Sequence, residues 1–151
     1  TINKNPYSNY NLNDFRSISG YIPNFPDIFP GTLFENIVLG RDDISENEIL
    51  KLAEEIGFHN FLDDYENDFL TELINNNSRT NRTKIKKILY LRALSNKPKI
   101  LIIEDPWIYL EEKEIENLYQ YLMGRKDLTI FFFASEDSRN YDQIIQLKDT
   151  I

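Results

Sequence analysis

The sequence contains no cysteine and only one histidine, His59. The first absence excludes disulfides and thiolate metal sites, and a lone histidine cannot form a His-rich cluster, so we expect no metal site. A reducing, cytosolic setting is compatible with this composition. Basic residues are also scarce, 17 against 25 acidic ones, which gives a formal net charge of −8. Because that charge opposes attraction to phosphate backbones, we expect no nucleic-acid partner.

Two longer patterns are missing as well. No apolar run approaches the length needed to cross a bilayer. None of the five glycines begins a G-x-x-x-x-G-K-[ST] motif, so the 151 residues contain no P-loop to cradle phosphate. The content of hydrophobic residues, 41%, and of charged residues, 28%, is ordinary for a globular protein. We therefore expect a single domain over residues 1–151.

Apolar periodicity predicts three helices after an opening segment, residues 1–17, that is typical of turns. The first helix follows a capping box formed by Ser45 and Glu48 and ends near residue 57. The second covers about residues 81–94, with Lys84, Lys87 and Arg92 expected to face solvent or anions. The third covers about residues 112–123.

Buried strands alternate with these helices. The run KILIIED at residues 99–105 is typical of a central parallel strand covered on both faces. A second strand is predicted over residues 129–134, where we expect Phe131, Phe132 and Phe133 to lie in the core, and a short one over residues 143–147. This order indicates an α/β fold with a parallel sheet.

Two stretches resemble a known family, YIPNFPDIFPGTLFENIVLG at residues 21–40 and KPKILIIEDPWIYLE at residues 97–111. Both are similar to segments of exporter-type ABC transporter ATPase domains. The resemblance implies a partial P-loop NTPase-like fold made of the Q-loop region, a helical subdomain at about residues 41–95 and the C-terminal part of the parallel sheet. It also implies that the family's first part, with the P-loop, is missing here, so ATP and Mg²⁺ would bind only with an upstream P-loop.

The positions that match the family's catalytic residues are altered. The family ends its strand with Asp, which holds Mg²⁺, and Glu, which activates water; here Glu104 precedes Asp105. The resemblance places the Q-loop Gln on Asn24 and the switch His on Ser135. A general base must come within about 3 Å of the proton that it removes, and losing one costs about 10²–10⁴-fold.

The signature motif that opens a helix in the family, Leu-Ser-Gly-Gly-Gln, falls on five residues that lack its glycines: Thr80, Asn81, Arg82, Thr83 and Lys84. Side chains there obstruct a close approach of backbone to phosphate. Either the motif has lost that role, or Arg82 and Lys84 bind phosphate in another geometry. The family's X-loop, at residues 73–78, has also lost its pattern.

The resemblance therefore implies a non-hydrolysing part of an ABC transporter at the cytoplasmic face of the membrane. Its expected partners are a transmembrane domain, contacted by Asn24, Phe25, Pro26, Asp27, Ile28 and Phe29, and a second ABC domain in a homo- or heterodimer. Two alternatives remain: an interaction module that has left transport, and an ATP-binding subunit whose P-loop lies upstream. Because an incomplete sheet exposes edges and apolar surface, we also expect self-association.

Overall fold

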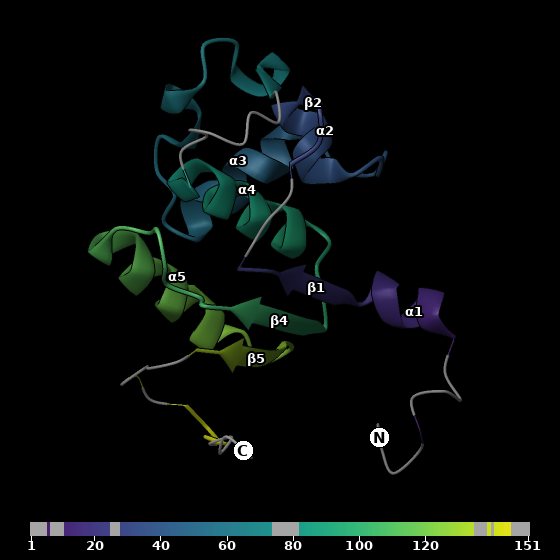
Figure 1. The fold of residues 1–151 in the computed structure, drawn as a ribbon, viewed down its shortest axis with the longest axis vertical. Coiled ribbons are helices and arrows are strands. Elements are labelled where there is room, and N and C mark those ends of the chain that lie inside the picture. The colour runs from purple at the N-terminus through teal and green to yellow at the C-terminus, as the bar shows by residue number, and fades with distance from the viewer. Residues whose placement is uncertain are drawn as a thin grey trace, which may run out of the picture.

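Three parallel strands form the centre of the molecule. The computed structural model describes residue 6 and residues 11–24, 28–73, 82–134, 139 and 141–145. Strands β1 (Ser19–Ile22), β4 (Ile100–Glu104) and β5 (Thr129–Phe133) form a sheet in the order β1-β4-β5 (Figure 1). The apolar run that ends in two acids is thus the middle strand of these three, which confirms the predicted parallel arrangement.

Helices and a small two-stranded antiparallel sheet lie between β1 and β4 in sequence, and one helix lies between β4 and β5. The helix α3 (Glu46–Glu55) follows the predicted capping box at Ser45, and α4 and α5 also match their predictions. One prediction was wrong, because the opening segment contains a short helix whose first turn is capped by Asn11. The other elements are α1 (Leu12–Ser17), β2 (Gly31–Thr32), α2 (Leu33–Val38), η2 (Phe61–Asp64), η3 (Asp68–Leu70), β3 (Glu72–Leu73), α4 (Arg82–Ser95) and α5 (Glu112–Gly124).

The core lies between one face of the sheet and the helices. Leu101 and Ile103 of β4 and Ile22 of β1 point to this face and are fully buried. Helix α4 contacts β1, α2 and α3, so it joins the sheet to the helical part above it (Figure 1). Its low amphipathicity is explained by this central position, since a helix covered on several sides is apolar on several sides.

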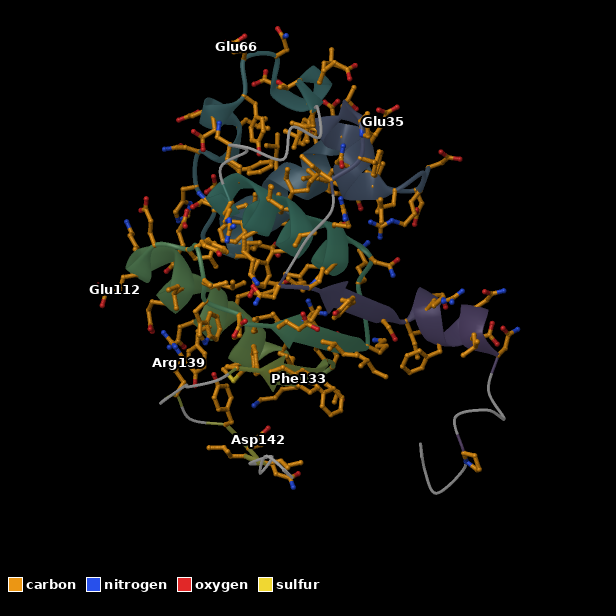
Figure 2. All side chains as sticks on the ribbon, viewed as in Figure 1. Glu35, Glu66, Glu112, Phe133, Arg139 and Asp142 are labelled. Atoms are coloured by element: carbon orange, nitrogen blue, oxygen red, sulfur yellow. The ribbon has the colours of Figure 1, made fainter. Side chains whose placement is uncertain are left out.

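The opposite face of the sheet is open among the described residues. Tyr21, Phe131 and Phe133 point to it from β1 and β5 and are 53%, 50% and 53% exposed. The prediction that all three phenylalanines are core residues was therefore wrong, because side chains alternate along a strand and only Phe132 packs against the core, where it contacts Trp107. Figure 2 shows Phe133 on β5, at the end of the molecule far from α2 and α3. The expected coverage of β4 on both faces was also wrong, because Ile100 and Ile102 on the open face are only partly buried.

A short strand was predicted near the end of the given sequence. Residues 143–145 do not form a strand, and the rest of the short strand predicted at residues 143–147 lies outside the described residues. Trp107 packs against Tyr119 and Phe132 within the chain. The X-loop positions 74–78 lie outside the described residues.

Two buried tyrosines give opposite predictions for the loss of a hydroxyl. The Tyr90 hydroxyl donates to the Pro106 carbonyl at 2.7 Å, whereas the buried Tyr65 hydroxyl has no hydrogen-bond partner among the described residues. We expect Tyr90→Phe to lower the free energy of unfolding by about 1 kcal/mol and Tyr65→Phe to raise it slightly, because only the first removes a satisfied bond. Urea unfolding of both variants tests this, and equal effects would contradict it.

Candidate functional site at the end of strand β4

The two acids predicted from the sequence lie together where β4 ends. Glu104 is the last residue of β4, and Asp105 follows it with a left-handed backbone, φ 40°. The Asp105 N–H donates to the Phe133 carbonyl of β5 at 2.8 Å. Aspartate tolerates left-handed backbone better than most residues, so its presence here suits the turn that leaves the strand.

Both carboxylates are engaged by side chains and backbone of β1 and its continuation. The Tyr21 hydroxyl donates to Glu104 Oε1 at 2.6 Å, and the Asn24 N–H donates to Glu104 Oε2 at 3.0 Å. The Asn24 Nδ2 donates to Asp105 Oδ2 at 2.6 Å. Three of the four carboxylate oxygens therefore accept hydrogen bonds from within the chain.

These bonds change the ionisation of the two partners in opposite directions. Hydrogen bonding from Tyr21, followed by that from the Asn24 N–H, lowers the pKa of Glu104. The same bond raises the pKa of Tyr21. Glu104 is thus held as an anion that accepts hydrogen bonds, and its carboxyl group has no proton to give at neutral pH.

A buried lysine that sequence reasoning did not single out lies behind the acids. Lys86 of α4 is 3% exposed, and its ammonium group donates to the backbone carbonyls of Glu104 and Asp105, both at 3.0 Å. Burial lowers the pKa of Lys86 to about 8, against the opposing attraction of the two carboxylates. No sequence signal marked it, because it sits in a stripe of basic residues typical of a solvated helix face.

The basic residues at the start of α4 make contacts within the chain. The Arg82 guanidinium donates to the Tyr109 hydroxyl, and Lys84 Nζ donates to the Asp64 carbonyl at 2.7 Å. Thr83 is half-buried, and Thr80 and Asn81 lie outside the described residues. The Lys84 ammonium group also lies 3.6 Å from Asp64 Oδ1, so its expected orientation toward an anion is confirmed.

Further along the helix, the same expectation is confirmed for Lys87 and wrong for Arg92. Lys87 pairs with Glu114 of α5 at 2.5 Å, and both side chains are largely buried. The Arg92 Nε donates to the Asn36 carbonyl at 2.7 Å. Helix α4 packs on several sides, so these cations satisfy polar groups of neighbouring helices.

The segment predicted to contact a membrane domain is anchored by a buried asparagine. Asn36 of α2 is fully buried, accepts from the Phe29 N–H at 3.1 Å and donates to the Phe29 and Thr32 carbonyls, both at 3.0 Å. Ile28 is buried, and Phe29 is 38% exposed. Phe25, Pro26 and Asp27 of the same segment lie outside the described residues, as does Ser135.

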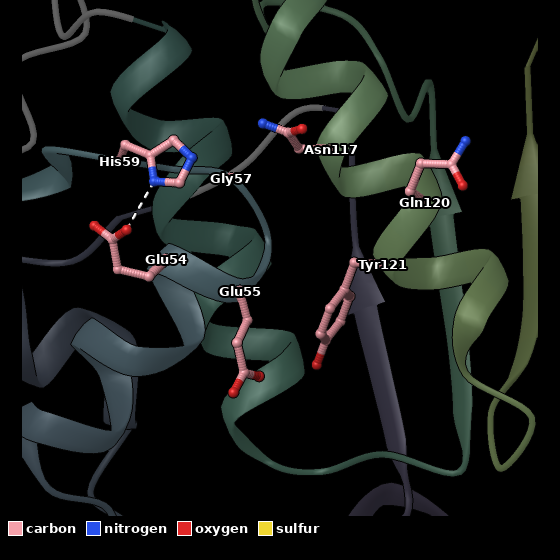
Figure 3. A pocket seen from close by; sticks show the side chains of 7 residues that line it. All are labelled: Glu54, Glu55, Gly57, His59, Asn117, Gln120 and Tyr121. Atoms are coloured by element: carbon pink, nitrogen blue, oxygen red, sulfur yellow. Dashed lines mark hydrogen bonds and ion pairs between the residues drawn. The ribbon is translucent and has the colours of Figure 1, made fainter.

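A separate hollow of about 330 Å³ lies between the end of α3 and α5. Figure 3 shows Glu54 and His59 on one side and Asn117 and Tyr121 of α5 on the other. The His59 Nδ1 lies 2.7 Å from Glu54 Oε2 of α3. None of the residues predicted to be functional lines this hollow.

No group of three or more His, Cys, Asp or Glu side chains in the described part of the chain could hold a metal ion. Within the same residues, no helix has both the length and the apolar character required to cross a membrane.

The chain resembles ATP-binding parts of transporters in both sequence and structure. No protein-family model matches it. A bacterial Atm1-family ABC exporter with ATP bound superimposes with a TM-score of 0.68, at 20% identity, over 79% of this chain and 21% of that one. The fold is that of part of an ABC ATPase domain. This confirms the fold class predicted from the two motif stretches.

Curated relatives agree with this fold. The chain is 27% identical to ATP-binding cassette sub-family B member 5 of Homo sapiens, over 98% of this chain and 12% of that protein. It is 32% identical to the leptomycin B resistance protein pmd1 of Schizosaccharomyces pombe, over 64% of this chain and 7% of that protein. An uncharacterized ABC transporter ATP-binding protein of Bacillus subtilis, YknV, is 26% identical over 94% of this chain and 24% of that protein. The chain thus spans less than a quarter of the length of these relatives.

Proposed function

We propose that this chain is a non-hydrolysing part of an ABC transporter that supports a membrane domain structurally or regulates it. One observation carries the proposal. The acids at the end of β4, where the family binds Mg²⁺ and activates water, are bonded to Tyr21 and Asn24 instead of being directed to a free site. An acid held in this way is poorly placed to remove a proton from water.

The start of α4 supports the same conclusion. In the family, small residues there allow backbone N–H groups to approach a phosphate, whereas here Arg82 and Thr83 carry side chains and Arg82 is engaged by Tyr109. The residues at the Mg²⁺ position, at the end of β4, and those at the phosphate position, at the start of α4, are therefore both altered. Their polar groups form hydrogen bonds within the chain.

Phosphate release in the presence of Mg-ATP tests the proposal. We expect the purified protein to release phosphate at least about 100-fold more slowly than an intact ABC ATPase, because a lost general base alone has that effect. The Asp105→Asn variant keeps the shape of the side chain and can still accept from Asn24. We expect it to match the unmodified protein. Mg²⁺-dependent release that Asp105→Asn abolishes would overturn the proposal in favour of an ATPase with an upstream P-loop.

The proposed contact between Phe29 and a membrane domain can be tested separately. Phe29 is exposed, and its backbone is fixed by Asn36, which makes it suited to act as an aromatic anchor. We expect Phe29→Ala to reduce the membrane-bound fraction of the protein in cells about tenfold. Leu70→Ala, which truncates a 71% exposed side chain in η3, is the matched control. Equal membrane binding by the two variants would contradict a role for this segment.

A further inference from the structure

A continuous set of contacts joins the end of β1, the end of β4 and helix α4. We propose that Asn24, Glu104, Asp105 and Lys86 form a permanent, metal-free clamp that fixes these three elements to one another. This strand-end clamp rests on the proposed function, since it uses the acids that would otherwise serve Mg²⁺ and ATP.

Asn24 provides the first half of the clamp by using two donors at once. Its N–H bonds to Glu104 and its side-chain amide bonds to Asp105, so one residue is held to two successive residues of the neighbouring strand end. Hydrogen bonds to carboxylates are roughly twice as strong as neutral ones. A rotation of Asn24 away from β4 would break both bonds together.

Lys86 provides the second half from the other side. Its ammonium group bonds to the backbone carbonyls of Glu104 and Asp105, at the turn where Asp105 adopts φ 40°. It also brings a positive charge beside two carboxylates. These are the tasks that a divalent cation performs in an oxygen-rich site, and here an ammonium group of α4 performs them without any ligand.

The consequence is a connection that does not depend on nucleotide. The family resemblance places Asn24 at the Q-loop position and α4 immediately after the signature, so the clamp ties the beginning of the predicted membrane-facing segment to the signature helix. Movement of one would be transmitted to the other in every state of the protein.

Hydrogen exchange of the Asn24 amide measures the clamp directly. We expect this amide to be protected equally in excess Mg²⁺ and in EDTA, since no metal takes part. Asn24→Asp places a carboxylate against Asp105, and Lys86→Met removes both bonds to the strand-end carbonyls. Each should accelerate exchange at residue 24 by about tenfold or more.

Matched variants separate this effect from general loss of stability. Asn60→Asp and Lys113→Met make the same chemical changes at exposed residues whose side chains form no hydrogen bond within the described part of the chain, and we expect neither to alter exchange at residue 24. If Lys86→Met accelerated exchange at residue 24 no more than in α5, or if protection at residue 24 required Mg²⁺, the clamp would be overturned.

Phosphate release from the same samples distinguishes the two proposals. Hydrolysis in a protein whose Asn24 protection is independent of Mg²⁺ overturns the proposed function and leaves the clamp standing. Absence of hydrolysis together with an unprotected Asn24 amide overturns the clamp alone.

Discussion

Gly57→Ala should lower the free energy of unfolding by roughly 2–5 kcal/mol, since it combines backbone strain with a steric clash. Gly57 has φ 83°, and a Cβ added there would lie 2.3 Å from the Cβ of Asn117 in α5. The Gly57 N–H bonds to the Glu54 carbonyl and the next N–H, that of Phe58, to the Ala53 carbonyl, the pattern that ends a helix with glycine in left-handed conformation. Neither the helix end nor α5 can shift without breaking such contacts.

Two other glycines separate the cost of backbone strain from the cost of the steric clash. Gly40 has a similar φ, 74°, but no atom within 4 Å of an added Cβ, and Gly124 also has open space without a positive φ. We expect Gly40→Ala to cost about 1 kcal/mol and Gly124→Ala to be nearly neutral. Thermal unfolding measures all three, with a fall on the order of 10 °C for Gly57→Ala. Equal losses for Gly57→Ala and Gly40→Ala would show that contact with Asn117 is unimportant.

Local sequence patterns were sufficient to predict most of the fold. The capping box at Ser45, the apolar run before Glu104 and the spacing of Leu118 and Leu122 each specify an element from its own residues. Burial on the two faces of β5 could not be predicted in the same way. Phe131 and Phe133 are exposed because none of the described elements covers their face of the sheet. The sequence of one strand does not show which of its faces another element covers.

The candidate site was predicted only in outline. Family resemblance located Glu104, Asp105 and Asn24, and the structure brings those three together. The burial of Lys86 was not predicted, because it depends on hydrogen bonds to carbonyl groups that are 18 and 19 residues distant in sequence. The same is true of Tyr21, whose bond to Glu104 spans 83 residues. Contacts of this range depend on strand order, which periodicity alone does not specify.

Asn36→Asp should destabilise the protein by about 3–5 kcal/mol at neutral pH, the cost of leaving a buried charge without a partner. The Asn36 amide donates to the Phe29 and Thr32 carbonyls, and a carboxylate there would face both carbonyls without a proton to share. The residue is fully buried, so water cannot compensate. The loss would release the Phe29 backbone and with it the proposed contact to a membrane domain.

The pH dependence of this loss identifies its cause. Burial raises the folded-state pKa of the new aspartate above its unfolded value of about 3.9, so the folded variant binds more protons and its deficit grows as pH rises above about 4. Asn36→Ala removes the same bonds without a charge, and we expect its deficit to be independent of pH. Asn60→Asp, at an exposed position, should leave stability nearly unchanged. Urea unfolding at several pH values tests all three, and a deficit of Asn36→Asp that does not shrink on acidification would show that lost packing, and not the buried charge, destabilises the variant.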